Sequence, residues 1–87
     1  MEDKVSLVTG TVFNGSGCVG NINAIDSVGF PGLCLQDGPL SVRTADLVST
    51  FPAGVTMAAT WDRQLMYARG QALGVVFRVK GAHLING

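Results

Sequence analysis

The sequence predicts an α/β fold built from one strand–helix–strand unit, and three segments carry that prediction. Leu33–Asp37 is a short apolar run that stops at a Gly-Pro pair, which is typical of a buried strand. Trp61–Lys80 repeats apolar residues at helical spacing, and Ala82–Ile85 forms a second short apolar run. Such a unit builds a parallel sheet with helices on its faces, and a single unit cannot bury both faces by itself.

The composition indicates a piece of a larger body. The chain has 87 residues, so it forms one domain at most. Hydrophobic residues make up 47% and charged residues only 14%, against about 25% charged residues in ordinary soluble domains. That balance is too apolar for a disordered chain and high for so small a domain. We therefore expect an exposed apolar patch where neighbouring parts belong.

Charge and residue counts exclude several classes of function. Six basic and six acidic side chains give a net charge of zero, so no nucleic-acid partner is expected. No apolar run approaches the roughly 20 residues that span a membrane, and Met1–Lys4 does not resemble the start of a signal peptide. Two cysteines and one histidine do not make a structural zinc site, so neither a metal nor another cofactor is expected.

The first third of the chain gives weaker signals. Glu2–Val8 fits a short helix or a short strand, and we favour the helix. Thr9–Gly20 is rich in glycine and is predicted to be a loop, whereas Asn21–Gly29 stays ambiguous. Phe30–Gly32 is a turn signal that precedes the first predicted strand.

The long helix has signals at both ends. Thr60 is predicted as its N-cap, and Asp62 is a first-turn acid that suits the helix dipole. Basic residues occupy the last turn, and Gly81 can take the left-handed position that follows it. Gly70 and Gly74 predict close packing of this helix against a neighbouring element.

The segment between the strand and the helix is predicted to be mostly irregular. Leu40–Pro52 shows no regular pattern, and Phe51–Gly54 is a turn signal. Val55–Ala59 is an apolar run that predicts a strand or buried extended chain.

A glycine pattern raises the possibility of a nucleotide site. Gly15–Gly20 matches G-x-G-x-x-G, and Asp37 follows at nearly the distance of a ribose-binding acid. Against this, Asn21–Val28 is too short for the helix that the motif should open. We prefer a flexible surface loop, and a small nucleotide-binding unit stays as an alternative.

Asp37 is the acid that the pattern singles out. It ends an apolar strand, and ligands in α/β folds bind at the carboxyl ends of strands. A carboxylate also makes short, strong hydrogen bonds with sugar hydroxyl groups. An aspartate that caps a turn explains the same position equally well. No pair of acids in this chain has a compelling claim to be the two carboxyl groups that flank a glycosidic bond.

The remaining chemistry-bearing residues give conditional predictions. Cys18 and Cys34 fit either one disulfide or two free thiols, and closing the loop between them would stabilise by about 3 kcal/mol. Asn14 begins a glycosylation sequon in the glycine-rich loop. Both features matter only in a secreted protein. His83 is the lone histidine, and a structural role is preferred for it.

Eight runs of the sequence follow one another in a distinctive order: Cys18–Asn21, Gly29–Leu40, Val42-Arg43, Ala45-Asp46, Val48-Ser49, Phe51–Val55, Ala58–Arg63 and Arg69–Gly74. Together they resemble the start of fungal family 3 glycoside hydrolases of the β-glucosidase type. The resemblance extends from about Lys4 to Gly81. The residues after Gly81 depart from the family's second strand, and Ser41 stands where the family usually has glycine.

The resemblance implies a fold. Family members begin with a (β/α)8 TIM barrel, so residues 4–87 would form an incomplete barrel domain that follows three terminal residues. In that frame Leu33–Gln36 is the first strand, Trp61–Lys80 the first large helix and Ala82–Ile85 the second strand. The rest of the barrel would be needed for folding.

The resemblance also implies an activity. Family members remove terminal non-reducing β-D-glucosyl residues from cellobiose, cello-oligosaccharides and other β-glucosides with retention, and they need no cofactor. Their nucleophilic Asp and acid/base Glu would lie beyond Gly87, so this chain alone is expected to be inactive. Asp37 corresponds to a carboxylate that binds glucose in the −1 subsite, with Arg43 in support. Cys18 and Cys34 look like a cysteine pair of the secreted members.

One further alternative remains. The chain could be a stand-alone, non-catalytic module that binds sugar or a partner protein. That alternative predicts a soluble domain with cooperative unfolding, whereas a barrel fragment is expected to fold poorly.

Overall fold

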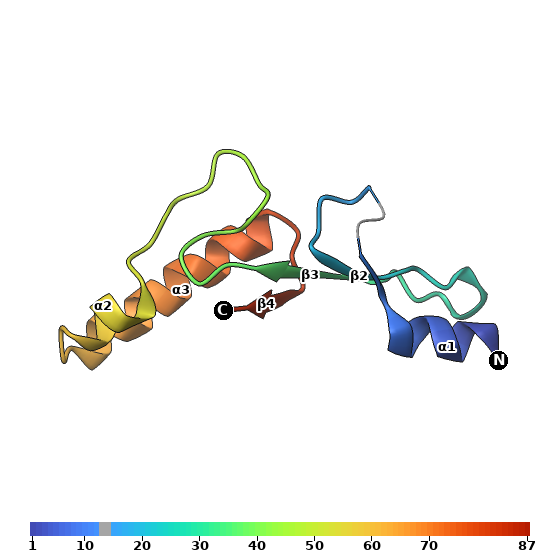
Figure 1. The fold of residues 1–87 in the computed structure, drawn as a ribbon, viewed down its shortest axis with the longest axis horizontal. Helices are drawn as coiled ribbons and strands as arrows, with labels where there is room; N and C mark the ends of the chain where they lie inside the picture. The colour runs from blue at the N-terminus through green and yellow to red at the C-terminus, as the bar shows by residue number, and fades with distance from the viewer. Residues whose placement is uncertain (13–14) are drawn as a thin grey trace.

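A four-stranded sheet runs through the middle of the computed structural model, which describes residues 1–12 and 15–87 (Figure 1). Its strands are β1 (Thr11–Val12), β2 (Gly20–Ile22), β3 (Leu33–Asp37) and β4 (Leu84–Asn86), in that spatial order. The first three are antiparallel, whereas β4 pairs in parallel with β3. The predicted α/β class and its strand–helix–strand unit are confirmed. The sequon at Asn14 lies outside the described residues.

The segment before β3 contains more structure than predicted. Helix α1 spans Glu2–Thr9, which confirms the favoured interpretation of that segment. The prediction of a loop from Thr9 to Gly20 is wrong at its ends, because β1 and the first residue of β2 lie there. A short 3₁₀ turn, η1 (Asp26–Val28), occupies part of the ambiguous segment. Strands of two and three residues are too short to show alternation, so pairing with distant residues decides their conformation.

Helix α2 (Gly54–Ala58) corrects another prediction. Val55–Ala59 was expected to be a strand or extended chain, but most of this run is helical. A short apolar run does not distinguish the two, because periodicity needs a longer window. Met57 is the buried residue of this helix, and the helix lies against α3.

Helix α3 (Arg63–Val79) is the long helix that the spacing predicts, with a different cap. The N-cap is Asp62, whose carboxylate accepts from the N–H groups of Gln64 at 2.9 Å and Leu65 at 3.0 Å. Thr60 was the wrong choice, because its hydroxyl donates to the Met57 carbonyl at 2.6 Å and so belongs to the end of α2. Gly81 takes the left-handed conformation with a φ of 80°, as expected after a helix.

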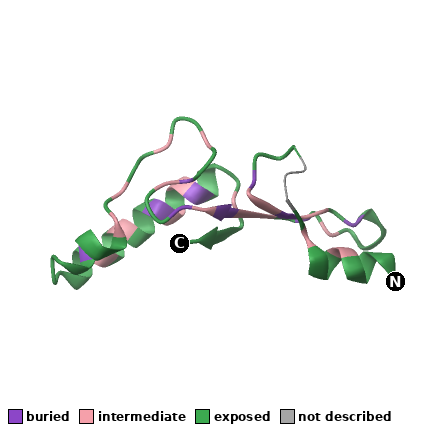
Figure 2. Cartoon of the chain, viewed as in Figure 1, coloured by how far each residue is buried: buried purple, intermediate pink, exposed green. Residues whose placement is uncertain are grey.

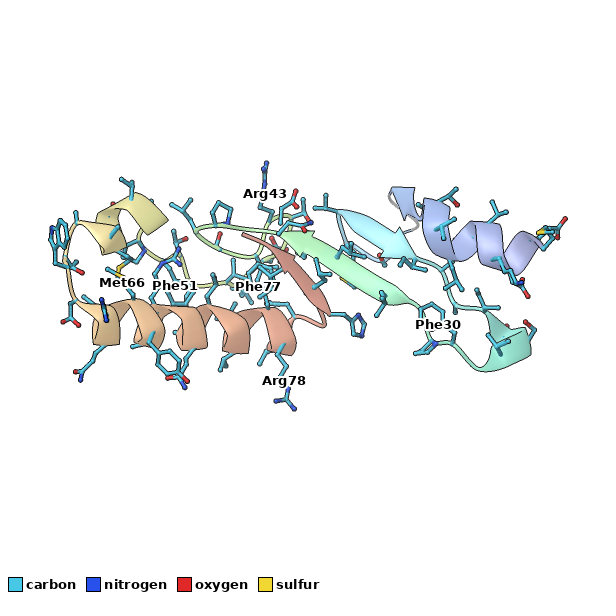
Figure 3. All side chains as sticks on the ribbon, turned by 90° about the horizontal axis from the view of Figure 1, so that it is seen from below. Phe30, Arg43, Phe51, Met66, Phe77 and Arg78 are labelled. Atoms are coloured by element: carbon cyan, nitrogen blue, oxygen red, sulfur yellow. A yellow bond between two sulfur atoms is a disulfide. The ribbon has the colours of Figure 1, made fainter. Side chains whose placement is uncertain are left out.

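The core is small and lies between α3 and the loop that follows β3. Val42, Leu73 and Phe77 form its buried cluster, and Phe77 is only 1% exposed. Figure 3 shows Phe77 and Phe51 on the inner side of α3, whereas Arg78 points away from it. Leu73 and Phe77 lie one helical turn apart, so the loop packs along a single stripe of the helix.

Many large hydrophobic side chains are exposed, as the composition predicts. Figure 2 shows how few residues are buried. Large exposed hydrophobic residues lie on both α3 and the sheet: Tyr67, Val75, Val79, Leu33, Leu84 and Ile85. The predicted close packing at Gly70 and Gly74 is not found, because a Cβ at either position would meet no atom of the described chain within 4 Å.

Candidate functional site

Asp37 lies at the carboxyl end of β3, beside the end of the parallel strand β4. Its register partner is Asn86, whose side-chain amide donates to the Asp37 carboxylate Oδ1 at 3.1 Å. The N–H of Gly38 donates to the Asn86 carbonyl at 3.1 Å, so the chain stays paired one residue beyond the strand. Asp37 is half-buried and Asn86 is exposed. The carboxylate is therefore held at the edge of the sheet where α/β folds bind ligands.

Gly38 makes the turn beside this carboxylate possible. A Cβ at this position would overlap the carbonyl oxygen of Ser41 and lie 2.9 Å from Cζ of Phe77. Neither neighbour can retreat easily, because one is backbone and the other is in the buried core. The close return of the chain after Asp37 therefore requires glycine.

The loop after Gly38 is fixed at both ends. The N–H of Arg43 donates to the Asp37 carbonyl at 3.0 Å, so these two predicted site residues are joined through the backbone. The Arg69 guanidinium on α3 donates to the carbonyl of Pro39, and to that of Pro52 at 2.7 Å. Arg69 thus ties the two ends of the loop to the same helix.

An open hollow of about 260 Å³ lies at this loop. Gly38, Pro39, Leu40, Ser41 and Arg43 line it. The Arg43 side chain is exposed and points away from α3 (Figure 3). The hollow therefore belongs to the loop that begins at the residue after Asp37.

Gln36 supports the strand end from within. Its buried amide accepts from the Val19 N–H at 3.3 Å and donates to the Gly17 carbonyl at 3.2 Å. It also accepts from the N–H of Asp37 at 3.3 Å and donates to the hydroxyl of Thr44 at 3.4 Å. One side chain therefore links the glycine-rich loop, the strand end and the loop beyond Arg43.

A disulfide joins Cys18 to Cys34, which settles the choice between one disulfide and two thiols. Their Cα atoms are 5.6 Å apart, a usual separation for this bond. His83 also bonds to the backbone of Cys34. Its side-chain Nδ1 accepts from the Cys34 backbone N–H at 2.9 Å, and its backbone N–H donates to the Cys34 carbonyl at 2.9 Å. His83 therefore has the structural role that was preferred for it.

The glycine pattern does not form a nucleotide site. Gly20 begins strand β2 and not a helix, so the motif lacks the helix N-terminus that would bind the phosphates. The described residues also contain no cluster of acids, histidines and cysteines that could hold a metal ion. Within residues 1–12 and 15–87, no helix is both long and apolar enough to cross a membrane.

A larger hollow lies elsewhere, but it lacks the chemistry of a site. Its volume is about 370 Å³, and it lies where the end of α1 meets strands β1 to β3. None of its lining residues has a titratable side chain: they are Leu7, Val8, Thr9, Gly10, Thr11, Gly20, Asn21, Ile22 and Leu35. We therefore place the candidate site at Asp37 in preference to the larger hollow.

Sequence reasoning missed three residues around Asp37. Asn86 was placed just beyond the second strand. Gln36 lies in an apolar strand, and its buried hydrogen bonds to other segments were not predicted. Arg69 was counted with the inward face of α3, and its loop-binding role was not foreseen. The available signal was a polar residue inside an apolar pattern, which when buried needs hydrogen-bond partners.

Comparison with known proteins gives a consistent result. No protein-family model matches the chain. A probable β-glucosidase G from Aspergillus terreus is 55% identical over 87 residues, which is 100% of this chain and 10% of that protein. A probable β-glucosidase L from Emericella nidulans is 53% identical over 95% of this chain and 11% of its own length.

Solved structures agree with these relatives. The β-D-glucoside glucohydrolase of Trichoderma reesei superposes with a TM-score of 0.86 at 44% identity, over 98% of this chain and 12% of that one. A β-glucosidase from Chaetomella raphigera gives a TM-score of 0.74 at 51% identity, over 83% of this chain and 10% of that one.

These matches correct one expectation. The resemblance was expected to end at Gly81, but the match to the Aspergillus terreus protein includes all 87 residues. The last six residues therefore belong to the similar region, and in the structure they contain β4. The chain is thus similar over its whole length to one part of these β-glucosidases, and it spans about 10% of the length of the relatives that it matches.

Proposed function

We propose that this chain is the part of a family 3 β-glucosidase that begins its (β/α)8 barrel and supplies a sugar-binding carboxylate. The observation that carries the proposal is the match over the whole chain, at 55% identity in sequence. The parallel pairing of β3 and β4, with α3 between them in sequence, fits the first repeat of such a barrel. Residues 4–87 would then be an incomplete barrel domain, and Met1–Asp3 would precede it.

Asp37 would bind hydroxyl groups of the terminal glucose in the −1 subsite. One carboxylate oxygen accepts from Asn86, and the other would accept from a hydroxyl of the sugar. Arg43 would support the site from the loop whose backbone is bonded to Asp37. Hydrolysis with retention needs a nucleophilic carboxylate and an acid/base, and both would come from the rest of the enzyme.

Two features bear on where the proposed enzyme works and on what covers this part of it. The disulfide between Cys18 and Cys34 supports a secreted protein, because such bonds persist in oxidising compartments. The exposed apolar side chains on α3 and the sheet support a neighbour that covers them, namely the remaining repeats of the barrel. The substrate class would be terminal β-glucosides such as cello-oligosaccharides.

A chimaera tests the proposal. In it these 87 residues replace the matching segment of the Aspergillus terreus β-glucosidase G. We expect the chimaera to hydrolyse an aryl β-glucoside. We expect Asp37→Asn to lower kcat/KM by about tenfold to 100-fold, because a hydrogen bond to a charged group is lost.

Asp46→Asn is the matched control, because the exposed Asp46 contributes its backbone carbonyl, not its carboxylate, to a hydrogen bond with Lys80. Normal turnover by the Asp37→Asn chimaera would remove Asp37 from the sugar site. An inactive parent chimaera that is correctly folded would count against the whole assignment.

A further inference from the structure

We propose that Asn86 is a second sugar-binding residue, which orients Asp37 and shares with it the recognition of two neighbouring hydroxyl groups. The inference rests on the proposed function, and it concerns a residue that the sequence pattern placed outside any element. It follows from the position, the exposure and the unused hydrogen-bonding groups of Asn86.

The sheet places the two side chains together. Asp37 and Asn86 are register partners in the parallel pair of β3 and β4, and each is the last residue of its strand. Register partners project to the same face of a sheet, and here the amide Nδ2 lies 3.1 Å from the carboxylate Oδ1. The pair therefore forms one polar unit at the carboxyl edge.

The bond between them leaves complementary groups for a ligand. An asparagine amide has two N–H donors and a carbonyl acceptor, and an ionised carboxylate accepts at both oxygens. Among the described residues, the bond to Asp37 uses one N–H and one carboxylate oxygen. One amide N–H, the amide oxygen and the second carboxylate oxygen remain for a ligand.

Those three groups fit a vicinal diol. Each hydroxyl of a sugar can donate one hydrogen bond and accept others. One hydroxyl can donate to the second oxygen of Asp37, while its neighbour on the ring donates to Asn86 Oδ1 or accepts from the free amide N–H. An ionised carboxylate offers no hydrogen-bond donor, so the amide of Asn86 supplies a donor that Asp37 lacks.

Stability does not account for this arrangement. Asn86 is exposed and its partner is only half-buried, so their bond competes with water and contributes little to folding. The hydrogen bond from Asn86 instead restricts the rotation of the Asp37 carboxylate, because it holds one of the two carboxylate oxygens. A fixed carboxylate loses less entropy when it binds a sugar.

The test uses the chimaera with an aryl β-glucoside and its mono-deoxy analogues. We expect Asn86→Ala to lower kcat/KM for the full glucoside by about tenfold. For the one deoxy analogue that lacks the hydroxyl bound by Asn86, the variant and the parent should be nearly equal. Asn86→Asp keeps the size and shape of the side chain but places a second negative charge beside Asp37, so its loss of kcat/KM should be larger.

The outcomes separate this inference from the proposed function. Ile85→Ala is the control on the same strand, and it should lower thermal stability without changing discrimination among the deoxy analogues. If Asp37→Asn cripples the chimaera while both Asn86 variants keep parental kcat/KM and discrimination, the role of Asn86 is wrong and the proposed function stands. If Asp37→Asn is also without effect, the site itself has been misplaced.

Discussion

At the scale of single residues, Gly38 constrains the site most strongly. A Cβ at Gly38 would overlap the Ser41 carbonyl oxygen and press against the Phe77 ring, so no side chain fits there. The predicted role of Asp37 depends on this turn, because the same turn brings Arg43 back to the Asp37 carbonyl.

Gly38→Ala in the chimaera should therefore lower both activity and stability. Forcing a methyl group against backbone typically costs about 1–3 kcal/mol, and the displaced loop carries the site. Gly54→Ala is the matched control, because a Cβ at Gly54 meets nothing within 4 Å. Thermal unfolding and kcat/KM are the measurements. Equal values for the two variants would show that the turn relaxes at little cost.

The sequence predicted part of this residue-scale picture. The position of Asp37 at the end of a strand was predicted, and so was the possible Cys18–Cys34 disulfide, because both depend on local sequence pattern. Asn86 and Gln36 were missed because their roles depend on which segments meet in space. Gln36, for example, bonds to Gly17 and Val19, which are distant in sequence.

At the scale of elements, α3 and β3 were predicted well, whereas the short elements α2 and β1 were not. A 17-residue helix contains several repeats of its pattern, whereas α2 has five residues and β1 has two. Caps depend on backbone geometry that spacing does not reveal. Thr60 was therefore predicted as the N-cap, whereas the structure has Asp62 in that position. Short elements take their conformation from tertiary contacts.

A peptide that spans residues 60–82 isolates the cap. Asp62→Ala should reduce its helix content in circular dichroism, because losing the cap costs about 1 kcal/mol of helix stability. Asp62→Asn keeps an oxygen acceptor and should change little. Gly74→Ala should stabilise the helix by about 1 kcal/mol and so raise its helix content, since Gly74 has open space around it. An unchanged spectrum for Asp62→Ala would place the start of the helix elsewhere.

At the scale of the whole molecule, the chain is long and thin. Its principal extents are 50 × 24 × 18 Å and its radius of gyration is 15.6 Å. A compact domain of this length has a radius of gyration of about 12 Å. The composition predicted that apolar side chains would be exposed, because a small body cannot bury so large a share of apolar residues. The elongation itself was not foreseeable, because it depends on where the sheet and α3 meet.

We expect the isolated chain to unfold without a cooperative transition. Within the part of the chain that the structure describes, the buried cluster contains only Val42, Leu73 and Phe77, which is too small to offset the conformational entropy of the chain. Thermal circular dichroism should show a broad, shallow change, and an apolar dye should bind at low temperature. A sharp sigmoidal transition would instead favour the stand-alone module. Testing the chain at several concentrations separates folding from association.

The Cys18–Cys34 bond has a consequence for proteolysis. It closes a loop with a sequence separation of 16, and that loop contains the exposed 3₁₀ turn at Asp26–Val28. A single cut in this turn would leave the two pieces covalently attached. The nicked chain would keep its apparent mass on a non-reducing gel and separate into two fragments only after reduction. The strand that carries Asp37 would thus stay tethered to the glycine-rich loop even after the backbone between them was broken.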